Sequence, residues 1–297
     1  MAKKILIFGG GFVGLNLAYT AKEKGWEPYI SDCVERPHPP EINWLICDIT
    51  DEADAKNTVD KIKPDYIVNV AALADIDKAE QNRELAYKIN VDGAKYLAEA
   101  SKKADARYIY FSSDAVFSGR ESIYHDNDQA APVNYYGYTK SIAEKDIIKI
   151  NPEAVILRVS LILGYSIAGG NSFFEAFKNK LENSGRIACS DTEIRTPIDV
   201  YTLCECVIML LENNLSGIFN IGSKDHISRL ELSKKIASLL DFDENKVVCQ
   251  EETVQANTGR ASRHRNGILA VTKIEEALNI QMPGIDEVIK RAAERKY

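Results

Sequence analysis

The sequence predicts an α/β fold, with a doubly wound parallel sheet and a smaller, partly helical C-terminal lobe. Six short apolar runs in the first half are nearly continuous rather than alternating, which is typical of strands buried on both faces of a parallel sheet. Segments with helical periodicity separate these runs, and a repeated β-α-β order requires right-handed crossovers. A glycine-rich turn follows the first run. Together these observations indicate a Rossmann-type core.

The elements expected in this core follow one another along residues 1–165. The strands are expected at Ile5–Phe8, Pro28–Ser31, Trp44–Cys47, Tyr66–Ala71, Tyr108–Phe111 and Val155–Val159. The helices are expected at Leu15–Lys24, Asp54–Ile62, Ala86–Lys102 and Ser141–Ile150. We assign residues 1–165 to one domain, because the alternation of strands and helices ends there.

Residues 166–297 show a different rhythm and are assigned to a second, smaller lobe. An amphipathic helix is expected over Ser172–Leu181, and a terminal helix over Asp286–Arg295. A Ser or Thr followed three residues later by Glu is a capping box, which predicts that Ser228 and Thr272 cap two further helices. A short apolar run at 217–222 is expected to return to the sheet as one more strand.

The composition excludes several classes of protein. With 45% hydrophobic and 27% charged residues, the chain is typical of a soluble globular protein, and its net charge of −7 argues against a nucleic-acid partner. The longest apolar runs are far shorter than the ~20 residues that span a bilayer, so no membrane partner is expected. The N-terminus lacks the apolar core of a signal peptide, and the six cysteines show no CxxC pattern, so a cytoplasmic location is expected. The four histidines lie far apart, which predicts no metal site.

A glycine-rich turn follows the first expected strand. Gly9, Gly11 and Gly14 match the pattern G-x-G-x-x-G, with Phe12 and Val13 between the last two, and a helical segment comes next. Such glycines allow a tight turn and let the backbone approach a pyrophosphate at the helix N-terminus. The turn therefore predicts a dinucleotide-binding site formed by these residues.

The second expected strand ends at an acidic residue, Asp32. In dinucleotide-binding folds an acid at about this distance from the glycines binds the hydroxyls of the adenine ribose. A carboxylate there repels a 2′-phosphate, so NAD is the favoured cofactor. Arg36 follows closely and weakens that preference, so NADP stays open as the alternative.

A second group of residues is suited to proton transfer. Tyr136 and Lys140 are four positions apart, so on a helix their side chains share a face. A cationic Lys near a phenol favours the phenolate, which allows proton exchange with a carbonyl or an alcohol. Ser112 and Ser113 leave the fifth expected strand at the edge where doubly wound folds bind ligands, and a hydroxyl there can polarise a carbonyl.

These features together resemble the extended short-chain dehydrogenase/reductases and, within them, the dTDP-4-dehydrorhamnose reductase family. The stretches that carry the resemblance are Val70-Ala71-Ala72, Asp77-Lys78-Ala79-Glu80, Ile89-Asn90-Val91-Asp92-Gly93-Ala94, Ser112-Ser113-Asp114-Ala115-Val116-Phe117, Pro132-Val133-Asn134-Tyr135-Tyr136-Gly137, Leu157-Arg158-Val159-Ser160 and Arg263-His264-Arg265-Asn266. The resemblance covers nearly the whole chain and is densest between residues 66 and 164.

The resemblance implies a role for each matching residue. Ser113 would hold the substrate carbonyl, Tyr136 would be the acid–base, and Lys140 would bind the nicotinamide ribose and tune Tyr136. Further cofactor contacts are implied for Asp48, Ile49, Ala71, Ala72, Leu73, Asn90 and Val159. Beside Ser113, the substrate residues are expected to be Asn171 and Arg195.

Two arginine-containing segments have two interpretations each. Arg195 either meets a diphosphate through charge-assisted hydrogen bonds or is a surface arginine in an ion pair. The segment 260–265, with three arginines and His264, is expected to be a solvated loop, with a phosphate or sugar-nucleotide contact as the alternative.

The function that the resemblance implies is an NAD(P)H-dependent reductase of a nucleotide-linked 4-keto-6-deoxy sugar. Two alternatives stay open: a sugar-nucleotide epimerase or dehydratase that recycles its NAD, and a non-catalytic nucleotide-binding subunit like the regulatory β subunit of methionine adenosyltransferase. Family members often pair through helices of the first domain, so a homodimer is a further expectation.

Overall fold

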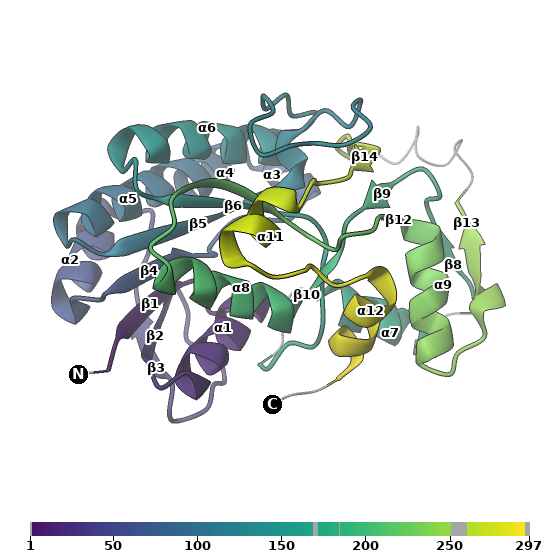
Figure 1. Ribbon diagram of the computed structural model, residues 1–297, viewed down its shortest axis with the longest axis horizontal. Coiled ribbons are helices and arrows are strands. Elements are labelled where there is room, and N and C mark those ends of the chain that lie inside the picture. Colours follow the sequence, from purple (N-terminus) through teal and green to yellow (C-terminus); the bar gives the residue numbers. More distant parts are fainter. Residues whose placement is uncertain (1, 169–171, 184, 251–259, 295–297) are drawn as a thin grey trace.

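The structure, a computed structural model, describes residues 2–168, 172–183, 185–250 and 260–294. Its centre is a seven-stranded parallel sheet with the order β11-β6-β5-β4-β1-β2-β3 (Figure 1). The strands are β1 (Lys4–Phe8), β2 (Glu27–Asp32), β3 (Asn43–Ile46), β4 (Tyr66–Asn69), β5 (Arg107–Ser113), β6 (Val155–Val159) and β11 (Gly217–Ile221). The predicted α/β fold with a parallel sheet is confirmed. The direction of winding changes between β1 and β4, which is where such sheets bind ligands.

Helices cover both faces of the sheet. One face packs on α1 (Phe12–Glu23) and α8 (Val200–Glu212), and the other on α2 (Glu52–Ile62), α5 (Ala94–Lys103) and α6 (Tyr135–Ile150). The apolar side chains of the strands therefore point into two separate cores, which explains why the strands read as continuous apolar runs.

The helix expected over Ala86–Lys102 is interrupted. The segment contains α4 (Arg83–Tyr87), a π-helical turn at Lys88–Gly93 and then α5, and the short α3 (Ile76–Gln81) precedes it. Within the π-helical turn, Gly93 lies so close to Ile49 that an added Cβ would stand 3.0 Å from it. The wider turn brings Asn90 inward, where it is fully buried.

The chain returns to the first core after residue 165. α8 packs on α1, β11 pairs with β6, and α11 (Thr272–Leu278) packs on β11 and α8. Apolar residues of α8 and α11 belong to the same hydrophobic core as α1. We therefore propose that the first domain takes in residues 198–221 and 271–282 as well as 1–165.

The remaining elements form the smaller lobe, on the right in Figure 1. Three helices, α7 (Phe173–Asn183), α9 (Arg229–Leu239) and α12 (Ile285–Ala293), enclose a core of their own. Short strands frame them: β8 (Ile187–Cys189) pairs with β13 (Val247–Cys249), and β9 (Ile194–Arg195) pairs with β12 (Ile227–Ser228) and β14 (Asn266–Gly267). A further pair, β7 (Ile162–Leu163) with β10 (Ile198–Asp199), belongs to the proposed first domain and packs on α12 of the lobe.

Helix ends decide where several site residues lie. Ser228 is confirmed as a cap, since its Oγ accepts a hydrogen bond from the Glu231 amide at 3.1 Å. Thr272 as a cap is wrong: it is already helical, and the buried Val271 takes the cap position without a side-chain hydrogen bond. α6 begins six residues before the expected Ser141, because Asn134 caps it by accepting from the Gly137 amide at 2.9 Å.

Two further features concern the described residues. No helix among them has the length and apolar character needed to cross a membrane. The six cysteines are free thiols, and Cys204 and Cys206 are buried in α8.

Candidate functional site

A cavity of about 1770 Å³ lies at the carboxyl ends of the parallel strands, and residues of both the sheet and the smaller lobe line it. Most of the predicted site residues lie along its walls: Gly9, Gly11, Phe12, Val13, Gly14, Asp32, Asp48, Ile49, Ala71, Ala72, Leu73, Ser113, Tyr136, Lys140, Val159 and Arg195. Asn90 lies behind the wall, and Asn171 lies outside the described residues.

The glycine turn shows why side chains are absent there. Gly9 has a φ of +105°, and a Cβ on it would stand 2.8 Å from the Ala71 amide nitrogen. A Cβ on Gly14 would stand 1.9 Å from the Gly9 carbonyl oxygen. A Cβ on Gly11 would meet nothing within 4 Å, since this residue faces open space at the start of α1. Two glycines thus allow the turn to close, and the third leaves room for a ligand at the helix N-terminus.

Asp32 stands over this turn at the end of β2. Its Oδ2 accepts a hydrogen bond from the Gly10 amide at 2.8 Å, and the Nε of Arg36 lies 3.6 Å from the same oxygen. Its side chain is 13% exposed, so the carboxylate faces the cavity in part. This placement fits a contact with ribose hydroxyls, and the adjacent guanidinium reduces the repulsion of a 2′-phosphate.

Asn90 supports the cavity wall from behind. Its Oδ1 accepts from the Leu73 amide at 2.9 Å, and its Nδ2 donates to Thr139 Oγ1 at 3.0 Å. It therefore joins the segment after β4 to α6. Its hydrogen bonds hold the Leu73 backbone in place. They do not involve Lys140, which donates to the Phe111 carbonyl instead.

Tyr136 and Lys140 lie on the first turns of α6. Lys140 is buried, its Nζ donates to the Phe111 carbonyl at 2.8 Å, and it lies 5.9 Å from the centre of the Tyr136 ring. Burial lowers the pKa of Lys140 to about 7, against the opposing effect of the Glu144 charge. Burial raises the pKa of Tyr136 above its usual value, while a hydrogen bond with Ser113 lowers it. Tyr136 is therefore a protonated hydroxyl at neutral pH, in contact with Ser113.

The two serines after β5 have different partners. Ser112 donates to the buried carboxylate of Glu144, which is ion-paired with Arg158 at 2.7 Å. Ser113 caps a short 3₁₀ turn, Asp114–Val116, by accepting from the Ala115 amide at 3.1 Å. Because successive side chains of a strand point to opposite faces, only Ser113 is directed toward Tyr136.

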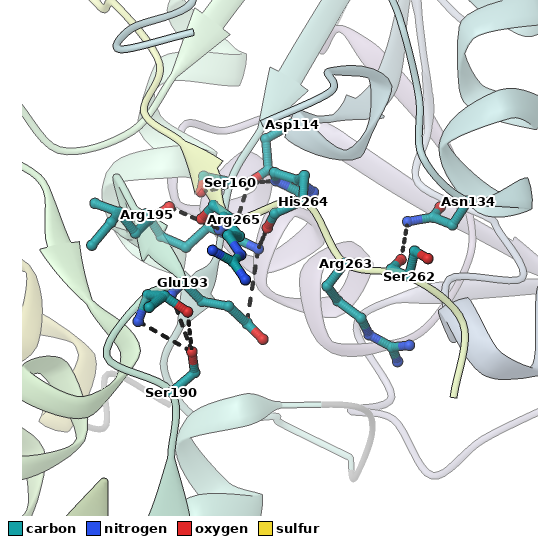
Figure 2. A network of polar contacts seen from close by, with 12 residues as sticks. Asp114, Asn134, Ser160, Ser190, Glu193, Arg195, Ser262, Arg263, His264 and Arg265 are labelled. Carbon is teal, nitrogen blue, oxygen red and sulfur yellow. Dashed lines mark hydrogen bonds and ion pairs between the residues drawn. The ribbon is translucent and has the colours of Figure 1, made fainter. Parts of the chain in front are cut away.

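Asp114 is the centre of a buried polar network that the sequence analysis did not single out (Figure 2). Its Oδ1 accepts from Ser113 at 3.1 Å and its Oδ2 accepts from Ser160 at 3.0 Å. Arg195 Nε and His264 Nε2 lie 3.4 Å and 3.3 Å from the same Oδ2. Burial alone raises the pKa of Asp114, but these two neighbours and Ser160 outweigh it and lower the pKa to about 2. The sequence signal that could have identified Asp114 is its position directly after Ser113.

Arg195 is held by protein groups on every side. Its guanidinium donates to the carbonyls of Ile194 at 2.8 Å, Arg265 at 2.9 Å and His264 at 3.0 Å, besides its ion pair with Asp114. Only 8% of the residue is exposed. This geometry favours the ion-pair interpretation over a diphosphate contact, with the difference that the pair is buried rather than on the surface.

Residues 260–265, called the strap below, pass over the cavity. Arg263 forms two parallel hydrogen bonds with the carboxylate of Asp77 in α3, at 2.7 and 2.9 Å. Asn134 donates to the Ser262 carbonyl at 2.9 Å, and His264 is only 3% exposed (Figure 2). The expectation of a solvated loop holds for Arg260, Ser262 and Arg265, which are exposed, whereas Arg263 is partly buried in its pair with Asp77 and His264 is buried beside Asp114.

The described residues contain no group of three or more His, Cys, Asp or Glu that could hold a metal ion. The cavity wall contains hydroxyls, guanidinium groups, carboxylates and the ammonium groups of Lys78, Lys140 and Lys180, of which only that of Lys140 is buried beside Tyr136. This set is suited to hydrogen bonding with a carbonyl and to proton transfer.

Comparisons with known proteins match nearly the whole chain. The family described as RmlD substrate binding domain matches residues 3–297. The chain is 28% identical to the dTDP-4-dehydrorhamnose reductase of Aggregatibacter actinomycetemcomitans, over 95% of each chain. It is also 28% identical to the probable low-salt glycan biosynthesis reductase Agl14 of Haloferax volcanii, over 81% of this chain and 80% of the relative. The crystal structure of Bacillus anthracis dTDP-4-dehydrorhamnose reductase in complex with NADP superimposes with a TM-score of 0.86 at 26% identity, covering 98% of this chain and 99% of the other.

Proposed function

This chain belongs to the RmlD substrate binding domain family, and from that premise we propose that it is an NAD(P)H-dependent reductase of a nucleotide-linked 4-keto-6-deoxy sugar. One observation carries the proposal: Ser113, Tyr136 and Lys140 meet on the wall of a cavity that also contains the glycine turn and Asp32. A carbonyl placed between Tyr136 and a dinucleotide on the glycine turn would be next to both a proton donor and a cofactor.

The cofactor end of the cavity fits a dinucleotide. The open space at Gly11 and the start of α1 would accept the pyrophosphate, and Asp32 would accept hydrogen bonds from ribose hydroxyls. Leu73 and Val159 line the walls on either side. Reduced nicotinamide, when bound, supplies the hydride for the carbonyl carbon.

The side chains of the chain supply the proton and position the carbonyl. Ser113 would turn its hydroxyl from Asp114 Oδ1 and donate its one hydrogen bond to the carbonyl oxygen. Tyr136 would transfer its hydroxyl proton to that oxygen as the alcohol forms. Since the pKa of Tyr136 is raised, the hydroxyl holds its proton at neutral pH and is ready to act as an acid. Lys140, when protonated, would stabilise the phenolate that remains.

The direct test is the absorbance of reduced nicotinamide after the protein is mixed with NADH or NADPH and a dTDP-4-keto-6-deoxy sugar. A loss of absorbance that requires the sugar is expected, and the preferred cofactor reports on Asp32. Tyr136→Phe is expected to lower turnover by at least about 10²-fold while NADH binding persists. Tyr138→Phe is the matched control, since Tyr138 lies on the same helix and is 44% exposed.

Two outcomes would overturn the assignment. Unchanged turnover in Tyr136→Phe would remove Tyr136 as the acid. Cofactor binding without any sugar-dependent loss of absorbance would favour the epimerase or the non-catalytic subunit instead. Tightly bound NAD with interconversion of sugar nucleotides would identify the epimerase.

A further inference from the structure

Arg229 is a cation on the lobe side of the cavity that the reductase mechanism does not use. It is the first residue of α9 and lines the cavity. Its guanidinium carbon lies 3.9 Å from the centre of the Phe173 ring in α7, another residue of the cavity wall. The ring supports one face of the guanidinium and leaves its N–H edges for other partners.

Within the described ranges, the Arg229 guanidinium donates no hydrogen bond and forms no ion pair. The carboxylate that acts on it most, Glu193, lies 3.8 Å from Arg195 and is shared with that residue. Arg195 differs sharply, because its donors are taken by three carbonyls and Asp114. Of these two neighbouring guanidinium groups, that of Arg229 has all its donors available to a ligand, whereas four of the five N–H groups of Arg195 face these protein groups.

The surroundings of Arg229 disfavour a positive charge. Burial is the main cause that lowers the pKa of Arg229, and the nearby charge of Arg195 adds to it. The position at the start of α9 is also the positive end of a helix dipole. An anion bound beside Arg229 would stabilise its positive charge against burial, against the charge of Arg195 and against the helix dipole.

The backbone amides at the start of α9 are already used. The Arg229 amide donates to the Glu193 carbonyl at 2.9 Å, and the Leu230 amide donates to the Ser190 carbonyl at 2.9 Å. The Glu231 amide donates to the cap residue Ser228. An anion here would therefore be bound by the Arg229 side chain and not by the helix terminus.

Other cations along the cavity lack this combination. Lys78 and Lys180 line it as well, but both are exposed, so water satisfies their charge. Arg263 is paired with Asp77. Arg229 combines partial burial, an aromatic support and available donors.

We propose that Arg229 binds the diphosphate of the nucleotide-linked substrate through charge-assisted hydrogen bonds, in the place that the sequence suggested for Arg195. A planar guanidinium held against a ring can meet two phosphate oxygens at once. The inference rests on the proposed function, because it assumes a nucleoside diphosphate in this cavity. It moves the expected diphosphate contact from Arg195 in β9 to Arg229 in α9.

The test uses ligand binding, so that it does not depend on turnover. Binding of dTDP, UDP and thymidine to the full chain is measured by calorimetry for the wild type, Arg229→Gln, Arg229→Lys and Lys180→Gln. Arg229→Gln is expected to weaken dTDP or UDP binding about tenfold or more and to leave thymidine binding unchanged. Arg229→Lys should lie between the two, and Lys180→Gln should stay within about twofold of the wild type. NADH affinity serves as the check that each variant is folded.

The outcomes separate the two proposals. If Arg229→Gln binds the diphosphates as well as the wild type does, or if Lys180→Gln loses as much, the role of Arg229 is wrong and the reductase proposal is untouched. If the wild type binds NADH but neither diphosphate, the proposed substrate class is wrong and the role of Arg229 fails with it. An equal loss of thymidine binding would make Arg229 part of a base site and would also overturn the inference.

Discussion

The two sides of the cavity are built on opposite principles. On the cofactor side, glycines remove side chains from the turn, so that backbone groups face open space at the start of α1. On the lobe side, Asp114, Arg195 and His264 come from distant segments and contact one another (Figure 2). On the first side, the absence of side chains leaves room for a ligand. On the second side, Arg195 is ion-paired with Asp114, whereas the guanidinium of Arg229 keeps its donors for a ligand.

Replacing Asp114 tests the lobe side and should have the largest effect on stability. Asp114→Asn removes the carboxylate charge that faces Arg195 and His264, so a buried cation loses its ion-pair partner. We expect a loss of about 3 to 5 kcal/mol in the free energy of unfolding, measured by urea denaturation at neutral pH. Glu193→Gln is the control, because that carboxylate is 25% exposed and lies farther from Arg195, at 3.8 Å. Equal losses in both variants would contradict a network centred on Asp114.

Two glycine variants test the cofactor side. Gly14→Ala forces a methyl group against the Gly9 carbonyl, so we expect a loss of about 3 kcal/mol or more in the free energy of unfolding. Gly11→Ala meets no atom, so its stability should change by less than about 1 kcal/mol. Its NADH affinity should fall nonetheless, because the methyl group enters the space for the pyrophosphate. Normal NADH binding by a stable Gly11→Ala protein would contradict the site.

The pH dependence of stability sharpens the account of Lys140. Its pKa is lowered to about 7 in the folded protein from a reference value of 10.5, so the unfolded chain binds more protons between these values. Stability should therefore rise with pH across this window, by about 3 to 4 kcal/mol for this residue alone. Comparing urea unfolding of ligand-free wild type and Lys140→Met from pH 7 to 10 isolates the effect. Parallel curves for the two proteins would show that Lys140 titrates normally.

The pair of Asp77 and Arg263 should give the smallest effect, because both side chains are partly exposed, 29% and 21%. A double-mutant cycle with Asp77→Asn and Arg263→Gln is expected to give a coupling of about 0.5 to 1 kcal/mol. Arg263 lowers the pKa of Asp77 below its reference value of 3.8, so the contribution is present above that pH and is lost as the pH falls further. A coupling that is unchanged at pH 2 would contradict an ion pair.

The residues of the candidate site that depend on local sequence patterns were predicted from the sequence. Tyr136 and Lys140 were identified because helical spacing is a local property, and the turn from Gly9 to Gly14 because its pattern lies within six residues. Their side chains do face one cavity. The start of α6 was placed six residues late, because the Asn134 cap was not taken as the signal of a helix end.

Residues that depend on remote partners were misjudged or missed. The strap was expected to be solvated because its arginines stand together in the sequence; Arg260 and Arg265 are exposed, but Arg263 is paired with Asp77 of the other domain. His264 is buried beside Asp114. Asn90, expected at the cofactor, does not line the cavity itself and holds the backbone of Leu73, which does. In each case the deciding partner lies far away along the chain.

The sequence by itself determined the parallel sheet, the glycine turn and the spacing of Tyr136 and Lys140, because periodicity and short spacings translate directly into which faces are buried and which groups are adjacent. Only the tertiary structure decided which charged groups are already paired. Arg195 and Arg229 look alike in the sequence, but folding surrounds the first with three carbonyls and a carboxylate and leaves the donors of the second facing the cavity. The physical reason is that a charge is satisfied by whatever lies within a few ångströms of it, and that is set by the fold rather than by neighbours along the chain.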